Sequence, residues 1–354
     1  MLTKFTIKNF RCFHELTLEN LSRLNLIGGM NNVGKTSLLE ALFLHLGANL
    51  PDLALKINFF RGIEQFKPHP ESIFYWLFFN KNMQNSIEFI TYDHNQIKNS
   101  LTMTINQDEI DFTEIDFTEN IRFSSSSNSN INPQKIFLSY DKNSQKYAAN
   151  FLINADGSLR GKIPFIQVKP CIFIISTIRS TQEDYERFSN IDKLNRQAEI
   201  LQALQLLEPR LKRLAVLIEG NLPVIAGDIG IGELIPIPYM GEGFSRLLSI
   251  LLAIANTPDG VVLIDEIENG LHHSKIVEIW QAIDLISQKN NTQIFATTHS
   301  FECIESAHQA FFNSPDYNFS YYRLERKKED NQIKVLSYNQ NTINTSIDLK
   351  LEMR

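Results

Sequence analysis

Residues Gly29-Met30-Asn31-Asn32-Val33-Gly34-Lys35-Thr36 form an intact G-x-x-x-x-G-K-[ST] phosphate-binding motif. The apolar run Leu24–Ile27 before it is suited to a buried strand, and residues 37–43 read as the start of a helix. This strand–loop–helix order is the context that the motif needs. Gly29 and Gly34 let the backbone turn its N–H groups towards a phosphate, and the N-terminus of the following helix attracts the same anion.

The motif predicts a nucleotide site in which Lys35 reaches the β- and γ-phosphates and Thr36 holds Mg²⁺. The residues expected to line the nucleotide are Gly29, Asn31, Asn32, Val33, Gly34, Lys35, Thr36 and Ser37. A chance glycine-rich turn is the alternative interpretation, and four fixed positions in the right context disfavour it.

A second apolar run, Val261–Ile264, is followed directly by Asp265 and Glu266. Four apolar residues in succession are typical of a strand buried on both faces of a parallel sheet, and ligands bind at the carboxyl ends of such strands. We expect Asp265 to support Mg²⁺ and Glu266 to activate the attacking water as general base. An acidic helix cap after a core strand is the alternative, and the phosphate motif makes it the weaker one.

Two further segments point to the same chemistry. The strand-like run 293–298 ends at His299, which is expected to hydrogen-bond the γ-phosphate or the attacking water, although a lone His is more often a surface or capping residue. The glycine-rich turn Tyr239–Arg246 opens an apolar helix over 247–255 and offers a second helix N-terminus to an anion.

The order of these segments resembles that in the ATP-binding-cassette (ABC) ATPase heads of the SMC, RecF and OLD families. The nearest likeness is to the stand-alone bacterial AAA-family ATPases of the RloA and abortive-infection type. Phe5–Phe13 is similar to their first strand, and Glu266–His272 to the stretch after their Asp-Glu pair. The specific motifs cover residues 1–46 and 236–302. The resemblance implies an α/β fold, a P-loop NTPase of ABC-ATPase head type with a mixed central sheet, an inserted antiparallel β lobe and a short helical lobe.

The resemblance also implies a composite site, in which each phosphate loop faces the glycine-rich signature of a partner subunit. The signature residues expected to act in trans are Gly241, Glu242, Gly243, Ser245 and Arg246, and Arg11 is expected at the nucleotide. This chain departs from the usual pattern at Gly241, where a serine is common. The glutamine that couples the γ-phosphate to the second lobe has no decisive position, and Gln65 and Gln167 are candidates.

Composition narrows the class of protein. The chain has 354 residues and a net charge of −6, which gives no global basic signature for nucleic acid, although a local basic strip on one face stays an alternative. Cys12, Cys171 and Cys303 are scattered without a C-x-x-C, so no zinc site is expected and a reduced cytoplasm fits. The N-terminus does not read as a signal sequence, and no apolar run reaches the ~18–20 residues of a membrane span.

The chain is predicted to form a single ATPase head over 1–354. Residues 1–49 and 220–354 are expected to form the nucleotide-binding core, residues 86–168 an inserted β-rich lobe, and residues 181–219 a short helical segment. Within the β-rich lobe, the tandem repeat 110–119 is predicted to be an edge hairpin, and Ser124–Asn132 a loop tip. The segment after residue 318 is predicted to form a terminal hairpin.

These features predict an ATPase that converts ATP and water to ADP and phosphate with Mg²⁺, and that forms an ATP-dependent homodimer or higher oligomer. The resemblance implies a role in anti-phage defence together with a separate effector protein. A DNA repair or maintenance ATPase of RecF or SMC type, binding DNA directly, is the main alternative. A transporter ATPase is disfavoured by the missing L-S-G-G-Q, and a GTPase by the missing N-K-x-D.

Overall fold

The computed structural model describes residues 1–48, 50, 53–61, 74–105, 134–153, 159–162, 168–176, 181–220, 222–312, 317–329, 331–349 and 351–353. All of the motifs quoted above lie within these ranges. Gln65, Gln167, the repeat 110–119 and the tract Ser124–Asn132 lie outside the described residues, so the predictions for them stay predictions.

A six-stranded sheet forms the centre of the molecule, in the order β16-β15-β3-β14-β13-β9. Its strands are β3 (Leu24–Gly29), β9 (Cys171–Ile174), β13 (Val261–Ile264), β14 (Gln293–Thr297), β15 (Phe319–Arg326) and β16 (Ile333–Tyr338). All neighbours are parallel except β15 and β16, which form the predicted antiparallel terminal hairpin. The three strands expected around the site are therefore adjacent, and their carboxyl ends share one edge.

A second sheet of seven strands is antiparallel and has the order β2-β1-β4-β5-β6-β7-β8. Its strands are β1 (Leu2–Phe10), β2 (Phe13–Glu19), β4 (Ile87–Asp93), β5 (Lys98–Ile105), β6 (Gln134–Lys142), β7 (Gln145–Ile153) and β8 (Leu159–Lys162). The strands expected within 86–168 do form. However, β4 pairs with β1, so the segment continues the N-terminal strands instead of forming a sheet of its own.

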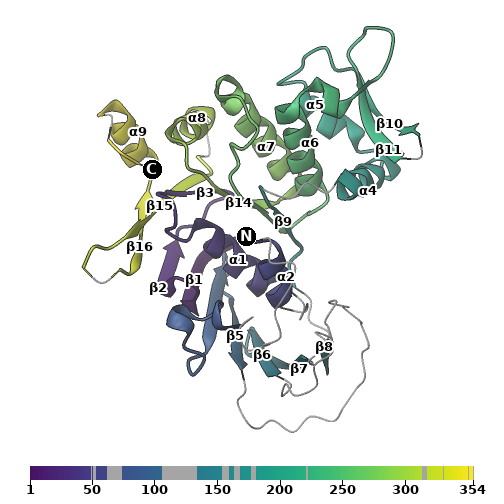
Figure 1. The fold of residues 1–354 in the computed structure, drawn as a ribbon. Coiled ribbons are helices and arrows are strands. Elements are labelled where there is room, and N and C mark those ends of the chain that lie inside the picture. Colours follow the sequence, from purple (N-terminus) through teal and green to yellow (C-terminus); the bar gives the residue numbers. More distant parts are fainter. Residues whose placement is uncertain are drawn as a thin grey trace.

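Helices cover both faces of the central sheet (Figure 1). On one face α1 (Lys35–Leu46) and α2 (Leu53–Phe59) lie beside the antiparallel sheet. The other face carries α6 (Glu242–Ala255), α7 (Ile276–Asn290) and α8 (Phe301–Phe311), with α4 (Thr181–Lys193) and α5 (Gln197–Leu204) farther out. The remaining elements are α9 (Gln340–Asp348) and the short 3₁₀ helices η1 (Phe79–Lys81), η2 (Ile237–Met240) and η3 (His273–Lys275).

The helical prediction for 181–219 is correct for α4 and α5 and wrong for the last part. Residues Arg213–Glu219 form strand β10, which pairs in antiparallel register with β11 (Leu222–Asp228), and β12 (Ile235–Pro236) completes a three-stranded sheet. Leu214–Ile218 is a continuous apolar run of five residues, and a run of this length does not distinguish a strand from the end of a helix by periodicity. Pairing with β11 satisfies the backbone groups that a helix would have used.

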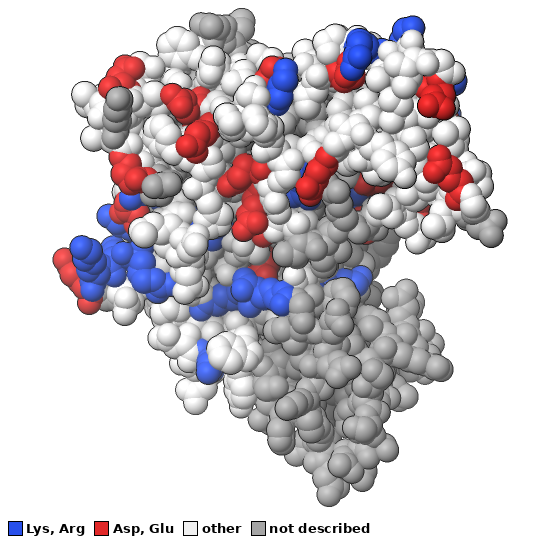
Figure 2. Space-filling view, turned by 45° about the horizontal axis from the view of Figure 1, so that its top comes forward, with Lys and Arg blue, Asp and Glu red and all other residues white. Residues whose placement is uncertain are grey.

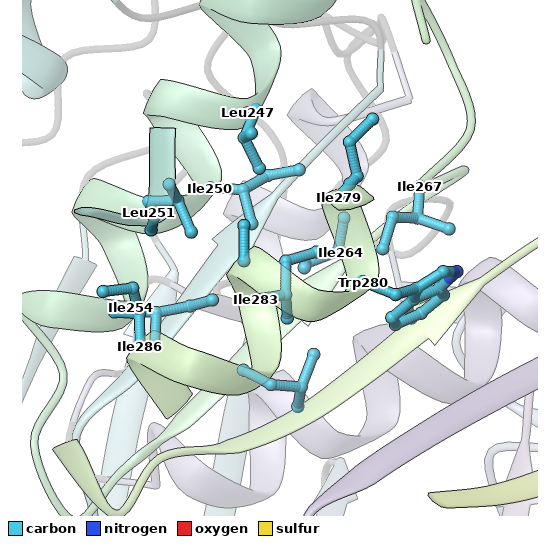
Figure 3. Packing of buried hydrophobic residues seen from close by; sticks show 14 of the residues in the cluster. Leu247, Ile250, Leu251, Ile254, Ile264, Ile267, Ile279, Trp280, Ile283 and Ile286 are labelled. Atoms are coloured by element: carbon cyan, nitrogen blue, oxygen red, sulfur yellow. The ribbon is translucent and has the colours of Figure 1, made fainter. Parts of the chain in front are cut away.

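The core lies on both faces of the central sheet. Val261 and Leu263 of β13 join the cluster on the α1 face, whereas Val262 and Ile264 join the cluster under α6 and α7. Figure 3 shows how closely the apolar side chains of α6 and α7, including Leu251 and Ile283, approach β13. The prediction that this strand is buried on both faces is confirmed, and the burial holds Asp265 and Glu266 at a rigid edge. No helix in the described part of the chain is long and apolar enough to cross a membrane.

Candidate nucleotide site

The phosphate loop, residues 29–36, joins β3 to α1 at the carboxyl edge of the sheet. Gly29 has φ 134° and Gly34 has φ 96°, a backbone conformation that favours glycine. A Cβ at Gly29 would lie 2.5 Å from the Leu324 carbonyl oxygen, and one at Gly34 would lie 2.5 Å from the Cys12 sulfur. Both glycines are therefore required by the backbone and by the close approach of β15 and of the β1–β2 turn.

Lys35 lies inside this loop and is only 5% exposed. Its Nζ donates to the carbonyl oxygens of Gly29, at 2.5 Å, and of Met30, at 2.8 Å. Burial lowers the pKa of the Lys35 ammonium to about 8, against the opposing effect of the carboxylates of Glu268 and Asp265. The loop thus holds a partly desolvated cation whose charge a phosphate group would stabilise.

Asp265 lies directly opposite α1. Thr36 Oγ1 donates to its two carboxylate oxygens at 3.1 and 3.2 Å, and Thr297 Oγ1 donates to Oδ1 at 2.7 Å. Burial raises the pKa of the Asp265 carboxyl, and the hydrogen bonds from Thr297 and Thr36 act in the opposite direction. A hydroxyl and a buried carboxylate that converge in this way fit Mg²⁺, which takes few protein oxygens and keeps several waters.

Glu266 and His299 face each other across the cleft. The distance from His299 Nε2 to Glu266 Oε1 is 3.6 Å. Glu266 has φ 47°, and its N–H donates to Thr297 Oγ1 at 2.8 Å, so Thr297 positions both carboxylate residues at the end of β13. The cleft has a volume of 390 Å³, and its lining residues are Asn32, Gly34, Lys35, Thr36, Ser37, Glu40, Phe60, Arg61, Phe173, Ile175, Ser176, Asp265, Glu266 and His299.

The structure therefore brings together Asn32, Lys35, Asp265, Glu266 and His299, which the sequence predicted separately. Strands β14 and β13 are adjacent and parallel, and this adjacency places His299 beside Glu266. One cleft therefore contains the phosphate loop, the hydrogen-bonded pair Thr36 and Asp265, and the Glu266 carboxylate with the His299 imidazole beside it.

Glu268 and Arg61 are charged residues at or beside the cleft to which the sequence analysis gave no role. Glu268 Oε1 accepts a hydrogen bond from the His299 N–H at 2.6 Å, and its buried Oε2 has no hydrogen-bond partner among the described residues. Arg61 lines the cleft, and its Nη2 donates to Ser37 Oγ at 3.2 Å. The sequence signal for Glu268 was its place within Glu266–His272, the stretch that resembles the one after the Asp-Glu pair of known ATPases, and Arg61 had no such signal.

Arg11 is placed differently from the expectation. Its Nε lies 2.6 Å from Glu40 Oε2, and the Glu40 carboxylate also binds Arg61 Nε at 2.7 Å. Burial lowers the pKa of Arg11 to about 10, against the opposing effect of Glu40. Arg11 is not among the residues that line the cleft. Its guanidinium instead forms an ion pair with Glu40 of α1 and links this helix to the β1–β2 turn.

The predicted signature lies at the N-terminus of α6, which begins at Glu242, five residues before the expected start of the helix. Gly241 caps the helix with φ 111°, and Gly243 packs so closely that a Cβ would lie 3.0 Å from the Gly270 carbonyl oxygen. Ser245 Oγ donates to the Ile237 carbonyl at 3.4 Å. None of the described residues that line the cleft comes from 241–246, so the chain does not bring its own signature to its own phosphate loop.

Arg246 was expected to face a partner subunit together with the rest of the signature, but in this structure it is buried within its own chain. It is only 4% exposed, and its guanidinium donates to the carbonyl oxygens of Asp265, at 3.2 Å, and of Ile175, at 3.4 Å. The helical period explains the position, because Arg246 lies one turn into α6 on the face that packs against the sheet. In this structure its side chain is directed into its own subunit, and a role towards a partner stays a prediction.

Residues 24–305 match the family described as "AAA domain, putative AbiEii toxin, Type IV TA system". The chain belongs to this family. The match starts at β3 and ends within α8, so it contains the phosphate loop, Asp265, Glu266 and His299. The expected resemblance to AAA-type ATPases is confirmed, and such ATPases use ATP and usually a divalent metal.

Individual proteins are also similar to this chain in sequence. A Helicobacter pylori protein named "ATP/GTP phosphatase" is 26% identical over 327 residues, which cover 86% of this chain and 87% of that protein. The uncharacterized protein MJECL10 of Methanocaldococcus jannaschii is 40% identical over 96 residues, which cover 26% of this chain and 43% of that protein.

Among solved structures, an SMC head bound to the C-winged helix domain of ScpA is 11% identical, with a TM-score of 0.50 over 98% of this chain and 99% of that one. At this identity the likeness concerns the fold alone. Together with the family match it confirms the predicted fold class, which is a P-loop NTPase of ABC-ATPase head type.

Proposed function

We propose that this protein hydrolyses ATP to ADP and phosphate in the cleft between the phosphate loop and β13. The observation that carries the proposal is the contact of Thr36 with Asp265 at 3.1 Å, next to Lys35 and Glu266 in one cleft. Phosphoryl transfer needs positioning and charge stabilisation more than covalent chemistry, and these groups supply both. The name of the Helicobacter pylori relative supports nucleotide hydrolysis, and the missing N-K-x-D motif favours ATP over GTP.

Each residue has a distinct part in this proposal. The loop N–H groups and Lys35 hold the β- and γ-phosphates, for which the ammonium exchanges its bonds to Gly29 and Met30. Glu266 accepts the proton of the attacking water, and His299 at 3.6 Å orients that water or the γ-phosphate. Thr36 and Asp265 would hold Mg²⁺, which supplies charge neutralisation at the phosphates when bound.

We further propose that two copies, or a higher oligomer, close around ATP. The support is geometric, because the signature at the N-terminus of α6 lies outside the cleft of its own chain, so a second copy is needed to bring one to the phosphate loop. The backbone N–H groups at Gly241 and Gly243 would then meet the γ-phosphate of the partner's nucleotide. ATP binds the closed dimer better than the open one, and hydrolysis reverses the preference.

For the biological role we propose the ATPase component of a cytoplasmic defence system against phage, which acts with a separate effector. The family description, which names a putative AbiEii toxin and a type IV TA system, supports this role. The runner-up is an ATPase of RecF or SMC type that binds DNA directly. ATP-dependent retention of duplex DNA by the purified protein would favour the runner-up, whereas loss of phage protection by a Glu266→Gln strain that keeps its effector would favour defence.

The biochemical proposal is tested by phosphate release from ATP and GTP with wild-type protein and with Glu266→Gln. Wild type should release phosphate only with Mg²⁺ and faster from ATP, and the variant should bind ATP without turnover. Light scattering of the variant should show a doubled mass with ATP and the unchanged mass with ADP. Wild-type turnover in Glu266→Gln would place the general base elsewhere, and an unchanged mass would remove the dimer from the proposal.

A further inference from the structure

The phosphate loop has a contact from outside the motif, made by the terminal hairpin. Strand β15 runs parallel to β3, and the pairing ends at Leu324 opposite Gly29. The strand continues to Arg326 and therefore extends past the end of β3 along the flank of the loop. There Arg326 Nη2 donates to the carbonyl oxygen of Asn32 at 3.1 Å, across 294 residues of sequence.

The rest of the guanidinium is held by the hairpin itself. Arg326 Nη1 donates to the Asn331 carbonyl oxygen at 3.0 Å, so one planar group bridges the hairpin turn and the loop. In the same hairpin Arg323 and Lys334 both pair with Glu325, at 3.2 and 3.0 Å. Within the described part of the chain, no carboxylate forms an ion pair with Arg326.

The orientation of one peptide group follows from this contact. Asn32 has φ 62°, a left-handed conformation. Because a trans peptide is planar, the C=O of Asn32 and the N–H of Val33 point in opposite directions. Arg326 lies exposed on the outside of the loop and holds the carbonyl outward, which directs the Val33 N–H inward. In contrast, the Gly29 and Met30 carbonyls turn inward to Lys35.

We propose that Arg326 is a positioning residue for nucleotide phosphates: it clamps the Asn32 carbonyl so that the Val33 N–H faces the α- and β-phosphates. The inference rests on the proposed nucleotide site and adds to it a residue from a strand that the phosphate motif does not include. The guanidinium also adds positive charge beside the loop, where Lys and Arg side chains gather over the β15–β16 hairpin (Figure 2).

The test compares ADP and ATP binding by wild type, Arg326→Met, Arg326→Lys and the control Lys328→Met, with turnover measured on the same samples. Lys328 lies in the same turn, so its variant removes the same charge and leaves the Asn32 contact intact. Arg326→Met should weaken ADP and ATP alike by about tenfold, the range of a lost charge-assisted hydrogen bond. Its kcat at saturating ATP should stay within about twofold, because the groups around Glu266 are untouched.

Arg326→Lys keeps the charge but not the planar fork, so it should recover only part of the affinity. Equal losses in Lys328→Met and Arg326→Met, or full recovery in Arg326→Lys, would show that charge alone is responsible and overturn the clamp. A lower kcat with unchanged KM would indicate a purely structural role and overturn it as well. If the wild type binds no nucleotide, the proposed function is wrong. If the wild type and Arg326→Met bind nucleotide equally tightly, only the proposed role of Arg326 is wrong.

Discussion

The hydroxyl of Thr36 and the carboxylate of Asp265 are 3.1 Å apart although 229 residues separate them in the sequence. Thr36 lies in the first turn of α1, which the phosphate loop joins to β3, and Asp265 directly follows β13. These two strands are not direct neighbours, because β14 lies between them. Strand β14 contributes Thr297, whose hydroxyl binds Asp265 Oδ1 at 2.7 Å. The pair proposed to hold Mg²⁺ therefore lies at the ends of three adjacent parallel strands, and Thr297 of the middle strand helps to position Asp265.

Thr297→Val should weaken Mg²⁺ binding. The variant keeps the shape of the buried side chain and removes the hydrogen bond to Asp265 and the acceptor of the Glu266 N–H. Leaving these groups unpaired costs about 1–3 kcal/mol. We expect the Mg²⁺ concentration for half-maximal turnover to rise by about tenfold, measured by phosphate release at saturating ATP.

Thr298→Val is the matched control for this prediction. Thr298 is equally buried, but its hydroxyl accepts from the Ser300 N–H instead of contacting Asp265. The control should lose stability without a change in Mg²⁺ dependence. Equal Mg²⁺ requirements in the two variants would contradict the assigned role of Thr297.

Nucleotide affinity should fall as the pH rises through about 8. Burial lowers the pKa of Lys35 to about 8, so the free protein loses the ammonium above this pH, and only the protonated form attracts phosphate. Binding at pH 8 or higher must then include proton uptake, which calorimetry in buffers of different ionisation enthalpy detects. The arginine of Lys35→Arg stays charged, so this variant should bind nucleotide more weakly than wild type but with an affinity that does not change up to about pH 9.5. A flat wild-type profile would contradict the lowered pKa.

Glu268→Gln should move this alkaline limit to lower pH. The Glu268 carboxylate is the strongest of the charges that raise the pKa of Lys35, and the variant removes it while keeping an acceptor for the His299 N–H. We expect the same titration to fall earlier, with little change in affinity near pH 6.5, where Lys35 is protonated in both proteins. If the affinity falls at the same pH in Glu268→Gln and in wild type, the Glu268 carboxylate does not influence the pKa of Lys35.

Much of this site follows from short motifs whose geometry is local. The conformation of the loop 29–36 depends on its own glycines, both of which have positive φ. The apolar run Val261–Ile264 likewise predicts a buried strand, and Asp265 follows at the edge of the sheet. The order of the strands, however, is a tertiary property. The sequence alone showed neither that β14 separates β3 from β13 nor that β1 joins β4 in the antiparallel sheet.

The residues that sequence reasoning missed act through distant partners. Arg61 and Arg326 reach Ser37 and Asn32 from segments without a recognised motif, and their contacts depend on how the chain folds back. Arg246 was misplaced for a related reason. It stands within the signature stretch, but the helical turn directs it inward to carbonyls at the ends of β9 and β13.

The last prediction concerns the subunit in which Arg246 acts. Arg246→Met leaves the carbonyls of Ile175 and Asp265 without their donor, at a cost of about 1–3 kcal/mol each. We expect a lower melting temperature and, because Asp265 moves, a higher Mg²⁺ requirement that leaves the variant inactive at the Mg²⁺ concentration that half-saturates the wild type. The decisive measurement mixes inactive variants, since a composite dimer of two different variants can regain one intact site.

Lys35→Ala mixed with Gly243→Asp should regain part of the wild-type turnover, because one site then combines an intact phosphate loop with an intact signature. Lys35→Ala mixed with Arg246→Met should stay inactive. In that dimer the subunit with an intact Lys35 carries the displaced Asp265, and the partner's Arg246 cannot replace the missing contact. Recovery in the second mixture equal to the first would show that Arg246 reaches across the interface after all, and that its inward position belongs to the open state only.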